Sequence, residues 1–307
     1  MDNRDPRQQG TVTTTMHRFI VYQYGKVGST SIVDALNGLP ESKAFQSHFL
    51  GEMAFQATLQ RLMDPGVPDY FFEHSAGQLI KNLRIYRHFL LRGQGRDRLT
   101  VITLAREPFD WFRSSISQDI NQHIESLKTM LRKQGATWRD DDDALQLGMT
   151  LVFERLLLAI RHFGSVDATC GAKRFVLKDV IPVADNADFQ SFMFFLNIFL
   201  RPHLWFRTHF REVMQIDIRD MEAVSSGLFR NRQGWGNTYL IRYEDLADAF
   251  PLMLDDLGFG KAVKLPRENE SRKKPYSRQL ERLFATGPAL ELRSLCTSED
   301  TRFLGYG

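Results

Sequence analysis

The chain has 307 residues, 43% of them hydrophobic and 25% charged, which excludes a collagen-like, coiled-coil or wholly disordered protein and leaves room for one large domain or two modest ones. Forty Lys and Arg against 37 Asp and Glu give a net charge of +3, too small for a general nucleic-acid-binding protein. Any site for a polyanion must therefore be local. Two cysteines, Cys170 and Cys296, cannot build a disulfide framework, so reduced thiols are predicted.

Residues 1–16 predict a flexible, polar tail without the apolar segment of a secretory signal, and we expect a cytoplasmic protein. Residues 17–25 (HRFIVYQYG) predict a buried strand, followed by a glycine-containing turn and a helix over 29–36 that closes at Gly38. Further strands are predicted over 44–48, 99–105, 174–178 and 238–242. Further helices are predicted over 51–63, 108–120, 144–162, 186–200 and 245–257. This alternation predicts an α/β fold, one domain over 17–307 with a mainly parallel sheet covered by helices on both faces.

Three segments stand out by composition. Residues 192–200 (FMFFLNIFL) are far shorter than the roughly 20 residues that span a bilayer, and predict a buried helix. Aromatic and basic residues follow over 201–207, so peripheral contact with a membrane or a lipid acceptor stays open. The run Asp140–Asp143 predicts a solvated helix N-terminus. Residues 261–282 hold eight basic residues against three Glu, either an anion site or a solvated basic surface.

A phosphate-binding loop is predicted between the first strand and its helix, in residues 24–31 (YGKVGSTS). A helix N-terminus presents unpaired N–H groups, and small residues let the backbone approach an anion closely. Lysine and hydroxyls add charge and donors. An ATPase loop places Lys after its second glycine, whereas Lys26 precedes Gly28, which disfavours a Walker nucleotide site. An ordinary turn between strand and helix is the alternative.

A second candidate element follows the strand predicted over 99–105. Arg106 would leave the carboxyl end of a central strand, Pro108 suits the first turn of a helix, and Ser114 would lie two turns into it. Ligands of α/β sheets bind in that crevice. A guanidinium matches the geometry of phosphate, and a hydroxyl can complete the contact. A structural ion pair of Arg106 is the alternative.

Together, the two elements resemble the cofactor motifs of sulfotransferases that use 3′-phosphoadenosine-5′-phosphosulfate (PAPS). The resemblance implies a P-loop-like loop that holds the 5′-phosphosulfate of PAPS, the donor, and a pair that holds its 3′-phosphate, Arg106 and Ser114. The loop residues implied are Lys26, Gly28, Ser29, Thr30 and Ser31. Residues 242–246 (RYEDL) match a late strand end of the family, which extends the resemblance over almost the whole chain.

The resemblance also points to the branch of the family. Residues 266–277 look like the segment that closes over the nucleotide in carbohydrate-directed members, with Asn269, Ser271 and Lys274 best placed. Val27 replaces a common Thr or Ser, and Glu107 replaces a commoner Asp. The form Lys-Val-Gly-Ser resembles that of carbohydrate-directed and bacterial capsule-type relatives, and the longer form Lys-x-Gly-Ser-Thr-Ser is similar to that of uronyl 2-O-sulfotransferases. It implies a carbohydrate or glycolipid acceptor.

Sulfuryl transfer needs a base for the acceptor hydroxyl and a positive charge at the leaving phosphate oxygen. Lys26 meets the second need. His48 ends the strand predicted over 44–48, where the family positions its catalytic base, although a histidine there can also be structural. Glu52 is the next candidate, followed by Glu73 and His74. No His/Cys cluster has the spacing of a zinc site, and this chemistry requires no metal.

Two other functions remain open at this stage. A P-loop-type nucleotide kinase is disfavoured by the position of Lys26. A non-catalytic relative of the fold would bind polyanions through residues 261–282.

Overall fold

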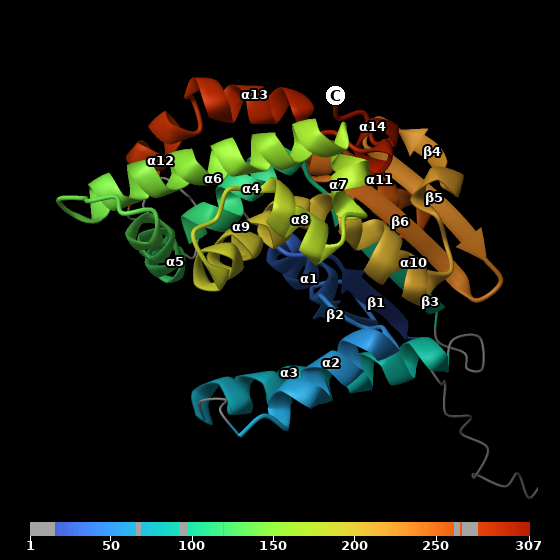
Figure 1. Ribbon diagram of the computed structural model, residues 1–307. Coiled ribbons are helices and arrows are strands. Elements are labelled where there is room, and N and C mark those ends of the chain that lie inside the picture. The colour runs from blue at the N-terminus through green and yellow to red at the C-terminus, as the bar shows by residue number, and fades with distance from the viewer. Residues whose placement is uncertain (1–15, 66–68, 92–97, 119, 261–264, 266–275) are drawn as a thin grey trace, which may run out of the picture.

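A six-stranded sheet forms the centre of the computed structural model, which describes residues 16–65, 69–91, 98–118, 120–260, 265 and 276–307 (Figure 1). The strands are His17–Tyr22 (β1), Ser42–Ser47 (β2), Arg98–Ala105 (β3), Glu222–Ser225 (β4), Leu228–Gln233 (β5) and Gly236–Arg242 (β6). Their order is β2-β1-β3-β6-β5-β4. The first four are parallel, and β5 and β4 are added antiparallel. The predicted α/β class with a mainly parallel sheet is confirmed.

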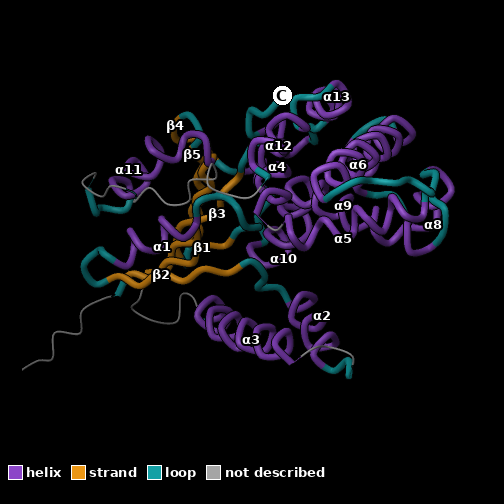
Figure 2. Tube along the Cα trace, turned by 90° about the vertical axis from the view of Figure 1, so that its left-hand side faces the viewer, coloured by secondary structure: helices purple, strands orange, loops and turns teal. Residues whose placement is uncertain are grey.

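Helices cover both faces of this sheet. Figure 2 shows α1 and α11 on one side and a larger layer with α4, α5, α6 and α9 on the other. The helices of these two layers are Ser29–Asn37 (α1), Pro108–Gln118 (α4), Ile120–Lys133 (α5), Asp141–Phe163 (α6), Asn186–Trp205 (α9) and Leu246–Asp256 (α11). The remaining helices are Glu52–Leu62 (α2), Asp69–Leu90 (α3), Val166–Cys170 (α7), Arg174–Val180 (α8), Arg211–Met214 (α10), Ser277–Leu283 (α12), Gly287–Leu295 (α13) and Glu299–Phe303 (α14). A π-helical turn, Phe206–Phe210, joins α9 to α10.

The parallel arrangement explains the apolar runs of the central strands. Every residue of β3 after Arg98 is buried, as expected for a strand covered on both faces. The carboxyl ends of β2, β1, β3 and β6 meet at one edge of the sheet. The chain moves from β1 to β2 on one side and then returns to β3 on the other. This reversal creates the crevice in which α/β proteins bind ligands.

One predicted strand is wrong, because residues 174–178 form the helix α8. A half-buried strand would alternate buried and exposed residues, whereas Leu177 is the buried residue of this segment and Phe175 is 65% exposed. The segment packs against α6 as a short helix. The first strand is confirmed but ends at Tyr22, three residues earlier than predicted.

The two compositional predictions on α6 and α9 are confirmed. Asp140 caps α6 by accepting a hydrogen bond from the Asp143 N–H, and the other acidic residues fill the first turn of the helix. Residues 192–200 lie inside α9 and are mostly buried. The aromatic side chains after them, Trp205 and Phe206, are buried as well, so they form no exposed surface. Among the described residues, no helix is long and apolar enough to cross a membrane.

The α2 and α3 helices lie beside the outer strand β2, apart from the large helical layer (Figures 1 and 2). None of the residues of α2 is buried, and near the end of α3 Ile85 and Phe89 are. The sequence pattern predicted α2 and did not predict α3.

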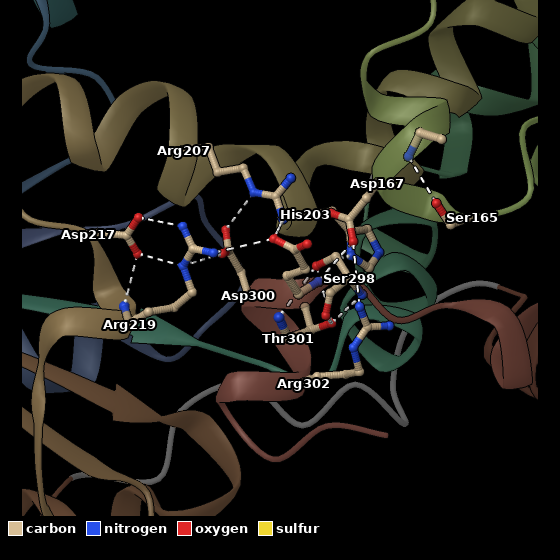
Figure 3. A network of polar contacts seen from close by, with 12 residues as sticks. Ser165, Asp167, His203, Arg207, Asp217, Arg219, Ser298, Asp300, Thr301 and Arg302 are labelled. Atoms are coloured by element: carbon tan, nitrogen blue, oxygen red, sulfur yellow. Dashed lines mark hydrogen bonds and ion pairs between the residues drawn. The ribbon is translucent and has the colours of Figure 1, made fainter.

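A polar network fixes the chain that follows α9 (Figure 3). Arg207 pairs with Asp300 of α14 at 3.1 Å and with Asp167 of α7 at 2.6 Å. His203, on the last turn of α9, lies 3.2 Å from the Ser298 hydroxyl, the N-cap of α14. These contacts tie the C-terminal end of α9 to two other helices. They thereby fix the position of Arg201, two residues before His203.

A buried ion pair joins α6 to the first turn of α9. The Arg155 guanidinium donates two hydrogen bonds to Asp188, at 2.6 and 2.8 Å, and both side chains are almost completely buried. Gln134 and the Ala184 N–H also donate to this carboxylate. Loss of one partner of such a pair leaves an uncompensated buried charge.

We therefore expect Asp188→Ala to lower the free energy of unfolding by about 3–5 kcal/mol, measured by urea denaturation. The matched control is Glu291→Gln, which removes a partner from the exposed pair of Arg161 and Glu291. That control should change the free energy of unfolding by about 1 kcal/mol or less. Equal effects of the two substitutions would contradict a structural role for the Arg155–Asp188 pair.

Candidate active site

A cavity of about 480 Å³ lies at the carboxyl ends of the four parallel strands. It is lined by the turn after β1, the residues after β2, the end of β3 with α4, one residue of α9, and Tyr243 after β6. Eight of the predicted site residues line it: Lys26, Gly28, Ser29, Thr30, Ser31, His48, Arg106 and Ser114. The other three, Asn269, Ser271 and Lys274, lie outside the described residues, as do the predicted tail up to residue 15 and most of the basic segment 261–282.

The turn between β1 and α1 has an unusual backbone. Gly25, Lys26 and Gly28 have positive φ angles of 92°, 57° and 75°. A methyl group at Gly28 would also lie 3.0 Å from a ring carbon of Tyr243, so both conformation and space require glycine there. A positive φ is unfavourable for Lys26, and such strain is typical of functional sites.

Side chains from three other segments hold this turn in place. The Trp111 indole donates a hydrogen bond to the Gly25 carbonyl at 2.7 Å, and Arg106 donates to the Lys26 carbonyl at 3.0 Å. The Ser29 hydroxyl oxygen accepts hydrogen bonds from Gln23 and Gln46, each at 2.8 Å. Its own hydrogen remains to be donated.

The N-terminus of α1 faces this cavity without a side-chain cap. Gly28 occupies the N-cap position and has no side chain to offer. Ser29, Thr30 and Ser31, which supply the first N–H groups of the helix, line the cavity. Unsatisfied N–H groups at a helix N-terminus attract anions.

Arg106 leaves the carboxyl end of β3, which lies between β1 and β6, and its position at a central strand is confirmed. Its N–H donates to the Tyr24 hydroxyl at 2.9 Å, and its guanidinium carbon lies 4.6 Å from the centre of the Tyr243 ring. Pro108 begins α4, and Ser114 follows two turns later, as predicted. Stacking on Tyr243 fixes the plane of the guanidinium while leaving donors for a ligand.

The charged side chains that line the cavity, among the described residues, are all basic. Lys26, Arg106 and Arg201 line it, and none of the described lining residues is acidic. The Arg201 guanidinium lies 5.8 Å from the centre of the Trp111 ring, and desolvation lowers its pKa. Three cations and an open helix N-terminus would favour an anion with more than one charged group.

His48 lies at the end of β2, and its Nδ1 is 2.9 Å from the Gln23 carbonyl oxygen. A carbonyl only accepts, so Nδ1 carries the hydrogen and Nε2 is the basic nitrogen of the neutral ring. Desolvation lowers the pKa of His48, the contact with Gln23 opposes this shift, and the charges of Lys81, Arg201 and Lys26 lower the pKa further. The lowered pKa favours the neutral form of His48.

The other candidate bases differ in position. A second cavity adjoins this one and shares Gln46, His48 and Phe49 with it. Glu52, the first residue of α2, lines neither of the two cavities, and Glu73 lines neither of them. His74 lines only the neighbouring cavity. His48 lines both.

Residues 242–246 hold neighbouring segments of the site through an ion pair and hydrogen bonds. Arg242 pairs with Asp245 at 2.9 Å. Glu244 accepts hydrogen bonds from the Glu107 N–H at 2.9 Å and from the Tyr306 hydroxyl at 2.6 Å. The Glu107 carboxylate in turn accepts from the Asp110 N–H, at the start of α4. The Glu107 side chain therefore caps α4, although Glu stands here in place of the commoner Asp.

Arg201 and Gln46 belong to the site but were not predicted. Arg201 follows an apolar segment that predicts a buried helix, and for the aromatic and basic residues after that segment only contact with a membrane or a lipid acceptor was considered. Only the packing of α9 against α4 brings it to the turn after β1. Gln46, an internal residue of β2, has no distinctive sequence signal.

Comparison with protein-family models, curated proteins and solved structures finds no match to this chain. Among the residues that the structure describes, no group of three or more His, Cys, Asp or Glu could hold a metal ion. Both cysteines are free thiols.

Proposed function

We propose that this protein transfers a sulfuryl group from PAPS to a hydroxyl of a carbohydrate or glycolipid acceptor. One observation carries the proposal: two motifs about 80 residues apart in the sequence, residues 24–31 and 106–114, line a single cationic cavity at the ends of β1 and β3. Each motif alone can be explained without a ligand, the first as an ordinary turn between strand and helix and the second as a structural ion pair. Their meeting in one cavity is what a bisphosphorylated nucleotide requires.

The residues present fit PAPS. Its phosphosulfate would lie at the N-terminus of α1, against Lys26 and the hydroxyls of residues 29–31. Its 3′-phosphate would meet Arg106 and Ser114. The replacement of a hydroxyl by Val27 removes no contact, because the Val27 side chain is completely buried.

The same residues supply the chemistry of transfer. The acceptor hydroxyl oxygen attacks sulfur, the bond between sulfur and the bridging phosphate oxygen breaks, and the hydroxyl proton passes to Nε2 of His48. Negative charge grows on the released phosphate oxygen, and the Lys26 ammonium stabilises it. Adenosine 3′,5′-bisphosphate leaves as the second product.

Ligand choice distinguishes this proposal from the two other functions. In a thermal-shift assay, adenosine 3′,5′-bisphosphate should raise the melting temperature, because it binds only the native state. Stabilisation by Mg-ATP alone would indicate a kinase. Stabilisation by heparin alone would indicate a polyanion-binding protein. Either result would contradict the proposal.

Arg106→Ala is expected to weaken the binding of adenosine 3′,5′-bisphosphate about tenfold to hundredfold, measured by calorimetry. The loss of a charge-assisted contact costs roughly 1.5–3 kcal/mol. Ser114→Ala should weaken binding less, because a neutral hydroxyl contributes less than a guanidinium.

The control for this prediction is Arg113→Ala. Arg113 lies on α4 next to Ser114, pairs with Asp110 at 3.1 Å and does not line the cavity. It should leave the affinity unchanged. Unchanged affinity in Arg106→Ala as well would remove Arg106 from the nucleotide site.

A further inference from the structure

A second cavity, of about 750 Å³, adjoins the first. It lies between the end of β2, one face of α2 and one face of α3, and we call it the α2–α3 groove. The two cavities share Gln46, His48 and Phe49. A molecule in the groove therefore reaches His48, the residue that we propose as the base, from a cavity next to the one proposed for the nucleotide.

The groove combines an apolar wall with positive charge. Phe49, Phe55 and Leu79 line it together with two alanines of α2. Phe49 packs edge-on against His209, with ring centres 5.3 Å apart, which fixes the aromatic wall. Burying an apolar group of a ligand against this wall is favourable, because apolar surface is removed from water.

The charged residues of the groove are all basic. Arg61 of α2 and Lys81 of α3 line it, and none of its described lining residues is Asp or Glu. The ammonium of Lys81 is close enough to His48 to lower the pKa of that histidine. Positive charge thus lies next to the end of the groove that adjoins the first cavity. An anionic group of a ligand would find complementary charge there.

We infer that the α2–α3 groove binds the acceptor as an amphipathic anion, with its apolar part between α2 and α3, its anionic group at Lys81 and its hydroxyl at His48. The fate of the hydroxyl depends on the proposed sulfuryl transfer, whereas the binding does not. The inference narrows the acceptor to a compound that joins an anionic sugar-like head to an apolar part. A neutral or wholly polar saccharide would leave one half of the groove without a partner.

Four probes separate the two contributions: glucose, glucuronate, hexyl glucoside and hexyl glucuronide, each below the concentration at which it forms micelles. Their binding to the protein without any nucleotide is measured by calorimetry. Hexyl glucuronide should bind at least about tenfold more tightly than hexyl glucoside and than glucuronate. Equal affinity for hexyl glucoside and hexyl glucuronide, or no preference for the hexyl compounds, would overturn the inference.

Two variants assign the contributions to residues. Lys81→Gln should remove about tenfold in affinity for hexyl glucuronide and leave hexyl glucoside unchanged, whereas Leu79→Ser should weaken both hexyl compounds alike. Arg87→Gln, an exposed residue of α3 that does not line the groove, is the control and should change neither. Retention of the full anion preference by Lys81→Gln would contradict the inference.

Sulfuryl transfer is measured separately, with PAPS present, so the two proposals can fail independently. Probe binding as expected, with no transfer to any acceptor, would count against the proposed function alone. Transfer to another acceptor, with no binding of hexyl glucuronide, would count against the amphipathic anion alone.

Discussion

Replacing His48 with Ala is expected to lower kcat/KM by about 10²–10⁴, the range that a positioned general base contributes. The binding of adenosine 3′,5′-bisphosphate should stay nearly unchanged, because an imidazole that accepts a proton from the acceptor contributes little to holding phosphate. Rates are measured with PAPS and a hydroxyl acceptor, and binding by calorimetry. Glu52→Gln is the matched control and should keep the wild-type rate, since Glu52 lines neither cavity.

The pH dependence of kcat/KM tests the same residue. Desolvation and neighbouring cations lower the pKa of His48, and its neutral form is the active one. The rate of the wild-type protein should therefore rise with pH, with a midpoint below 6.5, and reach a plateau above it. Arg201→Gln removes one of the cations that lower the pKa of His48, so the midpoint should move to higher pH.

The contrary outcomes are distinct. If His48→Ala keeps the wild-type rate and pH curve, His48 is not the base. If the rate collapses in Glu52→Gln instead, the role passes to that carboxylate. If His48 has a purely structural role, His48→Ala should lower the melting temperature and leave the pH curve unchanged.

Lys26→Ala is expected to lower kcat by about 10²–10³, the scale for one group that stabilises developing charge. The affinity for PAPS, measured by calorimetry without an acceptor, should fall much less, because the charge that Lys26 meets forms only as the bond to sulfur breaks. Alanine and lysine both carry a Cβ, so the positive φ at residue 26 is equally unfavourable for both. The fold of the turn should therefore survive the substitution.

Single-turnover rates and calorimetry on the same preparation separate the two quantities. The control is Lys178→Ala, which removes an exposed lysine of α8 that does not line the cavity. It should change neither the turnover rate nor the affinity. A turnover rate within a few fold of wild type in Lys26→Ala would show that the phosphosulfate lies elsewhere.

The central strands could be predicted from the sequence because burial on both faces leaves a continuous apolar run, as in residues 99–105. The antiparallel pair β4 and β5 could not, because its residues are largely polar and only partly buried. The pair is held by its register with β6, which local patterns do not contain. Likewise α3 was not predicted, and Ile85 and Phe89 are its buried residues among the side chains that the structure describes.

The candidate site divides in the same way. Lys26 and Arg106 come shortly after predicted strands, and Ser114 lies on the helix that follows Arg106, so their motifs indicated the carboxyl edge of the sheet, where the cavity lies. Arg201 depends on the packing of α9 against α4, and the polar network around Arg207 holds that end of the helix. Such long-range packing has no local signature in the sequence.

The most direct test of the proposed function follows sulfur-35 from labelled PAPS, with hexyl glucuronide and a mixed extract of glycans and glycolipids as acceptors. The proposal predicts labelled product and an equal amount of adenosine 3′,5′-bisphosphate with the wild-type protein, and about a hundredfold less of both with Lys26→Ala. Label that stays in PAPS, or that is lost as inorganic sulfate at the same rate with both proteins, would contradict sulfuryl transfer.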